Sequence, residues 1–352
     1  MPKKRKTLPK NFGELIKAND LTVLQAVFDT CELAAYDGYN KDTALHMFHV
    51  PTELICWLVE QGLDVNVREY YGRTPLYAQA ALGSDVVETL LELGADIHAK
   101  DDYGRTPLYI AAGNHRKDTV ALLIAHGADI HVTDDRGETP LSFALARCQN
   151  VDIADMAEIA DILLRAGAKI TPPIQEHIQR IGKEFEFRRA DFNKDLLPET
   201  DAGLARLYTL FGVKPVAKRQ THDGVSPILV PTGEWHEQHD ALWQLLVPGK
   251  GAAQTVQGEA IRLSGKLAYE IMDNGGCNWD GDFRKMLQAL VNCFAMGQPL
   301  TANLQQESAQ IATSLKSGTG DDHEPERLME LAVQWVALNP HPLPLKVPAY
   351  KR

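Results

Sequence analysis

The chain has 352 residues, more than one hydrophobic core usually supports, so we expect two domains. With 44% hydrophobic and 24% charged residues, its composition is that of a folded globular protein and excludes a largely disordered chain. The formal net charge of −11 makes it an acidic protein, which disfavours binding to the phosphates of nucleic acids.

The sequence also bears on where the protein resides. Apolar runs of about 18 residues, the length of a membrane-spanning helix, do not occur. The N-terminus, MPKKRKTLPKNF, is basic but lacks the apolar stretch of a secretory signal. The five cysteines are scattered and never spaced as CxxC, which argues against a disulfide framework and a cysteine-based zinc site. We therefore expect a cytoplasmic protein without a membrane-bound segment.

Charge is unevenly distributed along the chain. The first ten residues hold five Lys and Arg, and we expect residues 1–10 to form a flexible basic tail. The PKKRK stretch at residues 2–6 matches a basic nuclear-import signal, which would matter only in a nucleated cell. Residues 11–173 hold 12 Lys and Arg against 25 Asp and Glu, a net charge of −13. This charge predicts a basic protein partner and no nucleic-acid partner.

A pair of short motifs recurs four times in the first half of the chain. The first motif reads DTALH, RTPLY, RTPLY and ETPLS, and successive threonines in it are 31, 32 and 33 residues apart. The second reads GLDVNVR, GADIHAK, GADIHVT and GAKITPP and runs in phase with the first. Four copies of a paired motif predict a repeat architecture in which each unit buries its apolar face against its neighbours. The four threonines are Thr43, Thr74, Thr106 and Thr139.

The first motif has the features of a helix start. Each threonine can cap a helix, and in three of the four copies a proline follows at the first helical position. Gly94 and Gly127 of the second motif stand where a helix must end in a left-handed turn. The segment after each glycine, such as ADIHAKDDYGR, then projects as a hairpin-like turn toward the next repeat. In the last copy the stretch ARCQNVDIADMAE adds residues, which predicts a longer helix or loop.

These motifs resemble the ankyrin repeat. The resemblance implies a helical solenoid over residues 11–173, with residues 8–40 as a degenerate N-terminal capping repeat before four further repeats. The family's usual histidine after the TPL triplet is present only as His46; Tyr77, Tyr109 and Ser142 replace it, so we expect local repacking there. Ankyrin repeats are not catalysts, and the resemblance implies protein binding through the hairpin tips and inner helices.

The predicted tips carry the candidate partner-binding residues. Tyrosine supplies contact area, and carboxylates steer a basic partner. The aspartates also make the turn itself, so the tyrosines are the stronger candidates. The candidate residues are Glu69, Tyr70, Tyr71, Asp101, Asp102, Tyr103, Asp134, Asp135 and Arg136.

After Pro173 the repeat pattern stops. Residues 174–195 read as a charged connector helix, 196–340 as a mainly helical domain with an extended or hairpin segment, and 341–352 as an irregular Pro-rich tail. The expected fold class is therefore mainly α. Helices are predicted over Pro198–Phe211, Gly233–Val247, Ala252–Asn274, Asp282–Met296, Ala302–Lys316 and Glu324–Leu338, and short strand-like runs flank a turn at residues 222–224.

Residues 196–300 resemble a second group of proteins. The stretch WHEQHDALWQLLVP and the following GAAQTVQGEAIRLSGKLAYEIMDNGGCNWDGDF are similar to the C-terminal domain of bacterial ankyrin-repeat proteins encoded beside secreted polymorphic toxins. Those proteins are regarded as immunity factors that bind and block the toxin. The resemblance implies a toxin-binding role and brings no active-site residues with it.

Motifs for catalysis or metal binding are weak. His236 and His239 stand three residues apart, unlike HExxH, and a third ligand such as His222 or Glu259 would have to be added, so a solvated helix face is the preferred interpretation. Residues 278–282, NWDGD, are similar to part of a calcium loop, but Gly276 and Leu287 would then stand at the first and twelfth ligand positions, which should be acidic, so we expect Asp280 or Asp282 to cap a helix instead. The motifs GxSxG, GxxxxGK[ST] and GxGxxG are absent from the sequence.

We therefore predict a non-catalytic, cytoplasmic protein-binding protein without a cofactor or metal. The leading hypothesis is an immunity protein that neutralises a basic bacterial toxin. One alternative is an ankyrin adaptor or translocated effector that recruits a host protein. Another is an enzyme in the C-terminal domain, whose substrate the repeats select.

Overall fold

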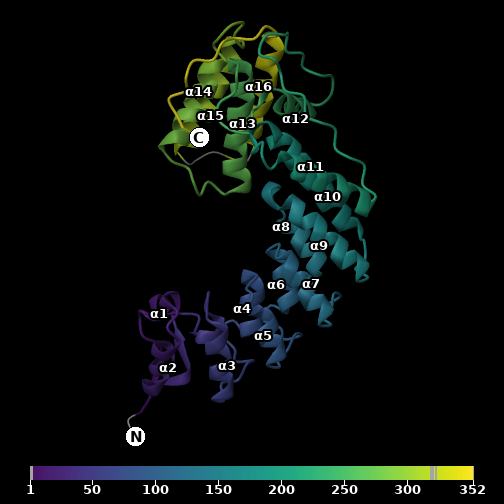
Figure 1. Ribbon diagram of the computed structural model, residues 1–352. Coiled ribbons are helices and arrows are strands. Elements are labelled where there is room, and N and C mark those ends of the chain that lie inside the picture. Colours follow the sequence, from purple (N-terminus) through teal and green to yellow (C-terminus); the bar gives the residue numbers. More distant parts are fainter. Residues whose placement is uncertain (1–2, 318–320, 322, 352) are drawn as a thin grey trace. The chain divides into compact units, whose positions relative to one another are not determined.

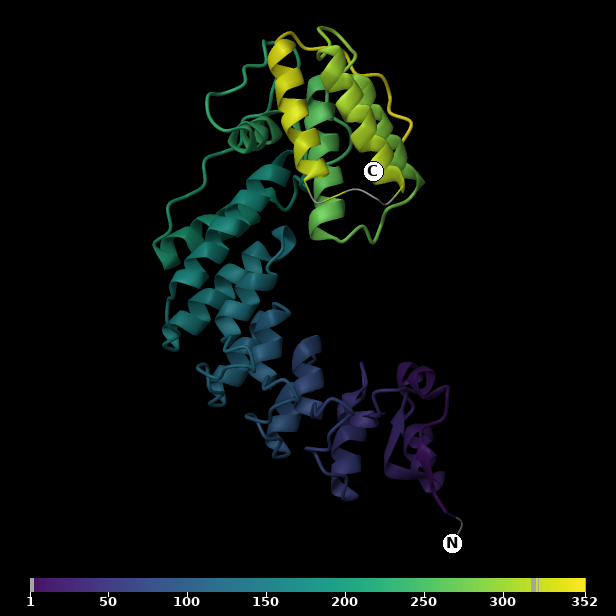
Figure 2. The same cartoon turned by 180° about the vertical axis from the view of Figure 1, so that it is seen from behind.

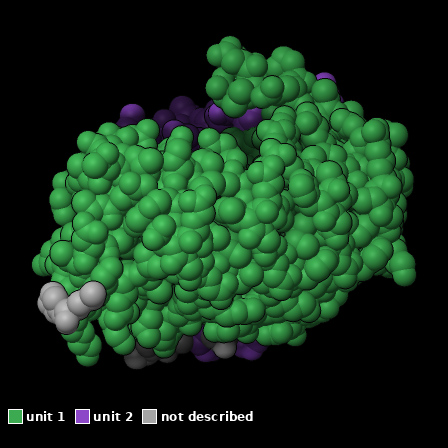
Figure 3. Space-filling model, turned by 60° about the horizontal axis from the view of Figure 1, so that its bottom comes forward, with its two compact units in different colours: residues 1–183, 193–216 green, residues 184–192, 217–352 purple. Residues whose placement is uncertain are grey.

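The computed structural model describes residues 3–317, 321 and 323–351. The chain divides into two compact units (Figures 1 and 3). Unit 1 holds residues 1–183 and 193–216, and unit 2 holds residues 184–192 and 217–352. Each unit is described by itself below.

Unit 1 begins with a small sheet that the sequence did not reveal. Strand β1 (Arg5–Thr7) pairs in parallel with β2 (Cys31–Asp37), and β2 pairs in antiparallel with β3 (Asp42–Thr43). Helices α1 (Phe12–Ala18) and α2 (Leu21–Thr30) form the helix pair predicted for the capping repeat. Residues 5–7 are therefore part of the fold, where the sequence suggested a flexible tail over residues 1–10; residues 1–2 lie outside the described residues.

Four helix pairs follow, as the paired motif predicts. The first helices are the short turn η1 (Ala44–His46), α4 (Pro75–Leu82), α6 (Pro107–Gly113) and α8 (Pro140–Arg147). The second helices are α3 (Thr52–Glu60), α5 (Val87–Glu92), α7 (Lys117–Ala125) and α9 (Ile153–Arg165). In both Figure 1 and Figure 2, α4, α6 and α8 lie along one side of the stack and α5, α7 and α9 along the other.

The predicted helix caps are confirmed. The hydroxyls of Thr74, Thr106 and Thr139 accept hydrogen bonds from the backbone three residues on, each at 3.3 Å, with proline at the first position. In the last repeat the short turn η2 (Asn150–Asp152) precedes α9, which has 13 residues where the second helices of the other repeats have 9, 6 and 9. The sequence expected a longer helix or loop here, and α9 supplies the longer helix.

The stack continues past the last predicted repeat. Helix α10 (Pro172–Arg188) is followed by the turn η3 (Arg189–Asp191) and by α11 (Leu197–Phe211), which packs on α9. A methyl group at Gly203 in α11 would lie 2.9 Å from the Cα of Ala154, so the two helices approach at backbone distance. The sequence predicts that the second domain starts at residue 196. In the structure the chain passes between the two units within α10 and again after Val216, because α11 buries its apolar face in unit 1.

Residues 213–231 contain the predicted turn without the predicted strands. The carboxylate of Asp223 accepts backbone hydrogen bonds from Val225 and Ser226, at 2.9 and 2.8 Å, and the flanking chain is irregular. The segment is fixed by Arg219, whose guanidinium donates to the carbonyl of Gln244 at 2.6 Å at the end of α12 (Trp235–Leu246). These hydrogen bonds to side chains stabilise the segment in place of the strand-to-strand backbone hydrogen bonds that a hairpin would have.

Unit 2 is built around helix α13 (Val256–Ala268). It packs against α12, α14 (Gly281–Cys293) and α16 (Glu324–Leu338), while α15 (Ala302–Ser317) covers α14 and α16. One continuous apolar cluster joins these helices and includes the fully buried Trp335 and Phe294. Helix α13 ends in a π-helical turn, η4 (Tyr269–Asp273), where the sequence predicted an uninterrupted helix.

The last described residues, 341–351, form an irregular segment, as the sequence predicts. Within it Pro344 forms an isolated antiparallel bridge with Thr255. Over the described part of the chain, the helices are too short or too polar to cross a membrane.

Candidate protein-binding surface

The turns between repeats are built on one repeated carboxylate. Glu69, Asp101 and Asp134 each stand five residues before a capping threonine. One oxygen of each carboxylate accepts backbone hydrogen bonds from the residues two and four positions on, at 2.9–3.1 Å. These bonds hold the loop closed and present the residues at its tip.

Two of these three carboxylates are unavailable to a partner. Glu69 and Asp101 are only 6% and 5% exposed, and Asp101 also accepts a hydrogen bond from Arg105 at 3.0 Å. Asp134 is half-buried; burial alone would raise its pKa, but the backbone hydrogen bonds from Glu138 and Arg136 outweigh it and the pKa is lowered. All three carboxylates are predicted from the sequence to contact a partner. In the structure they accept the hydrogen bonds that stabilise the turn.

Successive tips are joined by backbone hydrogen bonds at equivalent positions. In each bond the donor is the backbone N–H of the residue four positions before a capping threonine. The acceptor is a carbonyl oxygen in the preceding repeat, that of the residue three positions before its threonine. The bonds run from Tyr70 to Asn40 at 2.7 Å, from Asp102 to Tyr71 at 3.0 Å and from Asp135 to Tyr103 at 3.1 Å. We call these three bonds the tip ladder. It ties the tips into one rigid edge, which lowers the entropy lost when a partner binds.

Glycine is required at the joints of the ladder. Gly72 and Gly104 have φ of 73° and 78°, in the left-handed region. A methyl group at Gly104 would lie 2.9 Å from the Oδ1 of Asp135, so side-chain bulk would also separate neighbouring tips. The recurrent glycine of the motif therefore serves both the turn and the ladder.

Four tyrosines lie along this edge, and we call them the tyrosine row (Tyr39, Tyr70, Tyr71 and Tyr103). Tyr39 and Tyr70 are 76% and 52% exposed, with ring centroids 5.5 Å apart, and the ring of Tyr71 meets that of Tyr70 edge-on at 5.2 Å. Tyr103, 49% exposed, continues the row toward the C-terminal tips. Exposed aromatic rings held by each other are typical of the centre of a protein interface.

Arginines brace the inner part of the row. The guanidinium of Arg73 lies 5.1 Å from the ring centre of Tyr71, and that of Arg105 lies 4.5 Å from the ring centre of Tyr103. Arg73 and Arg105 are themselves held by the turn carboxylates Glu69 and Asp101. The rings are thus oriented before a partner arrives.

Tyr39 is not among the binding residues predicted from the sequence, although the sequence contains a signal for it. Tyr39 stands four residues before Thr43, as Tyr70 stands four residues before Thr74. The first repeat hid this equivalence because its loop reads GYNKDT in place of YYGRT. Tyr39 is the most exposed ring of the row and contacts Tyr70 directly.

Two exposed aspartates lie toward the C-terminal end of the edge. Asp102 and Asp135 occupy the same position as Tyr39 and Tyr70 in their repeats, and both are exposed, as is Arg136. Asp37 is also exposed, at the first tip two residues before Tyr39. Further exposed acidic residues lie on and around the second helices, among them Glu53, Glu60, Asp64, Asp85, Glu88, Glu92, Asp96, Asp118 and Asp129. The edge therefore carries its exposed rings toward one end and two exposed aspartates toward the other, within an acidic unit.

The histidine position of the motif links each repeat to the next turn. His46 caps its own helix through Thr43 at 2.9 Å, and its Nε2 lies 3.2 Å from the carbonyl oxygen of Arg73. Tyr77 occupies the equivalent site in the next repeat, where burial and then the charge of Asp101 raise the pKa of its phenol. Tyrosine thus faces the next turn carboxylate in place of histidine, and the repeats still stack.

In unit 2 the residues considered for chemistry have structural roles. His239 is buried and its Nε2 lies 3.0 Å from the Oγ of Ser264, whereas His236 is exposed, so the two imidazoles do not meet. Asp280 caps α14, accepting from the backbone of Asp282 and Phe283 at 2.9 and 3.2 Å, as predicted. Among the described residues, His, Cys, Asp and Glu side chains form no group of three suited to a metal ion.

Comparison with known families agrees with the geometry of unit 1. A model described as ankyrin repeats in three copies matches residues 14–101 and 94–173. The N-terminal region of this chain therefore contains ankyrin repeats, which fit its helical solenoid and imply a role in protein–protein interaction. A search of curated proteins found no significant match.

Proposed function

We propose that the tyrosine row and the acidic end of the tip ladder form the binding site for a protein partner that carries a basic patch beside an apolar one. The observation that carries this proposal is the row itself, since Tyr39 and Tyr70 are both more than half exposed and packed against each other. Rings held on a rigid edge bury large area at low entropic cost. The carboxylates of Asp102 and Asp135 extend the edge for a cationic surface.

We further propose that the protein is non-catalytic and that its partner is a toxin domain, which it neutralises as an immunity protein. The net charge of −13 over residues 11–173 supports this identification because it suits a basic enzyme. The toxin-binding role itself is what the sequence resemblance of residues 196–300 implies. In this proposal unit 1 captures the toxin and unit 2 covers part of it. Nucleases fit the partner's description because their phosphate-binding clefts are basic.

An adaptor or effector role is the competing proposal, and an import-competent PKKRK segment would favour it. Within that segment, Lys4 donates to the carbonyl of Phe28 at 2.6 Å, and Arg5 lies in β1 with its guanidinium 3.4 Å from the Sγ of Cys31. An import receptor would have to detach both residues from the fold. This cost favours the immunity proposal over the adaptor.

The test is a tagged pull-down from the native organism's lysate, washed at low and at high salt. We expect one stoichiometric, basic, toxin-like protein to survive both washes. The variant carrying Tyr39→Ala and Tyr70→Ala should lose most of it, since interface tyrosines each contribute on the order of 2 kcal/mol. Tyr269→Ala is the matched control, because Tyr269 is an exposed tyrosine of unit 2.

The outcomes separate the proposals. Retention of the partner by the Tyr39 and Tyr70 variant would move the binding site off the row. Several weak partners in place of one would favour the adaptor. A captured toxin that keeps full activity when bound would refute the immunity role, and turnover of a captured substrate by the chain would make it an enzyme.

A further inference from the structure

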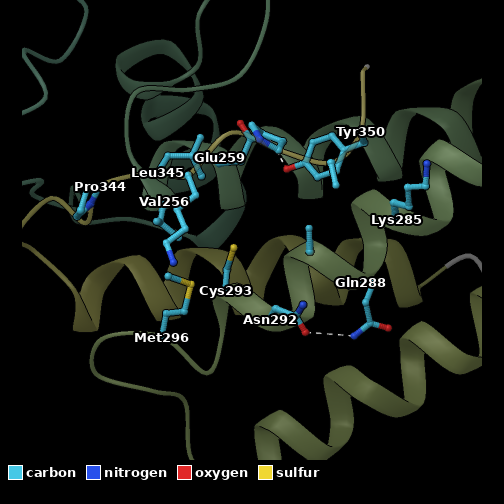
Figure 4. Close-up of a pocket in the computed structure, with 14 residues that line it drawn as sticks. Val256, Glu259, Lys285, Gln288, Asn292, Cys293, Met296, Pro344, Leu345 and Tyr350 are labelled. Carbon is cyan, nitrogen blue, oxygen red and sulfur yellow. Dashed lines mark hydrogen bonds between the residues drawn. The ribbon is translucent and has the colours of Figure 1, made fainter.

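Unit 2 contains a cavity of about 570 Å³ between α13, α14 and the C-terminal segment (Figure 4). Its size is that of a small-molecule site. One face of α14 supplies side chains at helical spacing, α13 supplies Val256 and Glu259, and residues 344–350 close the remaining side. The α14 residues are Lys285, Gln288, Ala289, Asn292 and Cys293, and Met296 follows the end of the helix.

The wall formed by the C-terminal segment is anchored at several points. The side-chain amide of Gln257 donates to the carbonyls of Asn339 and His341, at 2.9 and 2.7 Å, and its carbonyl accepts from the backbone of Leu343 at 3.0 Å. Figure 4 shows Tyr350 reaching Glu259, to which its hydroxyl donates at 2.7 Å. The cavity is therefore held open by the fold before any ligand enters.

The one acidic residue of the lining is neutralised. Glu259 is 1% exposed and accepts hydrogen bonds from Arg262 at 2.6 and 2.9 Å and from the backbone of Ala253 at 2.9 Å, besides that of Tyr350. Burial favours the neutral acid, but these bonds prevail and lower its pKa, so the carboxylate stays ionised beside its arginine. Because the charge of Glu259 is already paired with that of Arg262, the carboxylate repels a bound anion only weakly and does not favour a cationic ligand.

The remaining charged residues of the lining are lysines. Lys346 is exposed on the C-terminal segment, and Lys285 is exposed on α14, where it also lies 3.1 Å from Asp282. The amides of Gln288 and Asn292 lie along the same face of α14 as Lys285. Apolar groups, including Val256, Ala289 and Leu345, make up most of the surface below this cationic rim.

We propose that this cavity binds an amphipathic organic anion, namely an unbranched medium-chain carboxylate. The chain lies against Val256, Ala289 and Leu345, where its burial drives binding, and the carboxylate stays at the rim beside an exposed lysine, Lys285 or Lys346. A cationic head group on the same chain meets a like charge there. The site belongs to unit 2 alone and does not rest on the proposed protein-binding function.

Calorimetric titration of the full-length protein tests the proposal, with decanoate as the probe and decyltrimethylammonium as its charge-reversed control, both below their micellar concentrations. We expect decanoate to bind at one site and at least about tenfold more tightly than the cation. Ala289→Trp or, if that variant does not fold, Ala349→Trp fills the cavity and should abolish binding. Ala309→Trp, on the exposed face of α15, is the matched control and should bind as the unaltered protein does.

A second pair of variants tests the rim. Lys285→Met with Lys346→Met should weaken decanoate binding about tenfold and leave the cation unaffected or slightly tighter. Equal binding of the two probes, binding that survives tryptophan in the cavity, or the absence of decanoate binding would each overturn the proposal.

Discussion

The backbone N–H of Asp102 donates a hydrogen bond to the carbonyl oxygen of Tyr71 at 3.0 Å, and this bond joins the second repeat tip to the third. It makes the tyrosine and the aspartate parts of one edge, although they lie 31 residues apart in the chain. The aromatic end of the edge is thereby held at a fixed distance from its acidic end. In the proposed function, a partner recognises this fixed arrangement of rings and charges.

The first prediction concerns the rate at which the partner binds. Because unit 1 is acidic, the association rate constant with a basic partner should fall about tenfold or more between about 0.05 and 0.5 M salt, while dissociation changes little. Stopped-flow fluorescence measures both rates. In the variant carrying Asp102→Asn and Asp135→Asn the salt dependence should be shallower; an association rate that ignores salt would show that charge does not steer the encounter.

The second prediction separates a turn carboxylate from its exposed neighbour. Asp101→Ala leaves two backbone N–H groups and Arg105 without their acceptor in a buried site, so the free energy of unfolding should fall by about 3 kcal/mol. Asp102→Ala, one residue along and exposed, should change it by less than about 0.5 kcal/mol. Urea unfolding compares the two variants, and equal effects would mean that burial of Asp101 does not matter.

The third prediction concerns the packing of α11 on α9. Gly203→Ala places a methyl group 2.9 Å from the Cα of Ala154 and 3.0 Å from the carbonyl oxygen of Ile153, so the helices must separate. Overpacking should lower the free energy of unfolding by about 1–3 kcal/mol. Replacing glycine in a helix raises it by about 1 kcal/mol, so we expect a net loss of stability. Gly13→Ala in α1 has open space around the new methyl and should be neutral or stabilising. Thermal unfolding that ranks the two variants in the opposite order would contradict this packing.

The fourth prediction concerns acid sensitivity of unit 2. Burial lowers the pKa of His239 from 6.5 to about 4. Its folded-state pKa lies below the unfolded value, so the unfolded chain takes up the proton first as the pH falls. The contribution of His239 to the free energy of unfolding is therefore fully present above pH 6.5 and is lost between pH 6.5 and about 4. We expect the total loss to be about 3 kcal/mol.

The unfolding free energy of three proteins, measured across that pH range, isolates the contribution of His239. His239→Gln should flatten the decline, whereas His236→Gln, an exposed histidine of the same helix, should leave it unchanged. Identical pH profiles for His239→Gln and the unaltered protein would show that His239 is not the responsible group.

Much of the helical architecture could be predicted from local pattern. A capping threonine followed by proline specifies where a helix begins whatever packs around it, and for this reason the starts of α4, α6 and α8 were predicted correctly. The same holds for Asp280 at the start of α14. The match of residues 14–173 to ankyrin repeats rests on these local signals, repeated in phase.

The sequence by itself thus determined the repeats, most helices and the acidic charge of unit 1, because each depends on neighbouring residues or on composition. Only the tertiary structure decided which tip residues are exposed: Asp101 and Asp102 are adjacent and chemically alike, yet one is buried in the turn and the other faces solvent. It also decided that residues 5–7 join a sheet, and that the C-terminal segment walls a cavity through Gln257, more than 80 residues away in the chain. Contacts between distant segments leave no periodic trace in the sequence, since their free energy appears only when the chain brings them together.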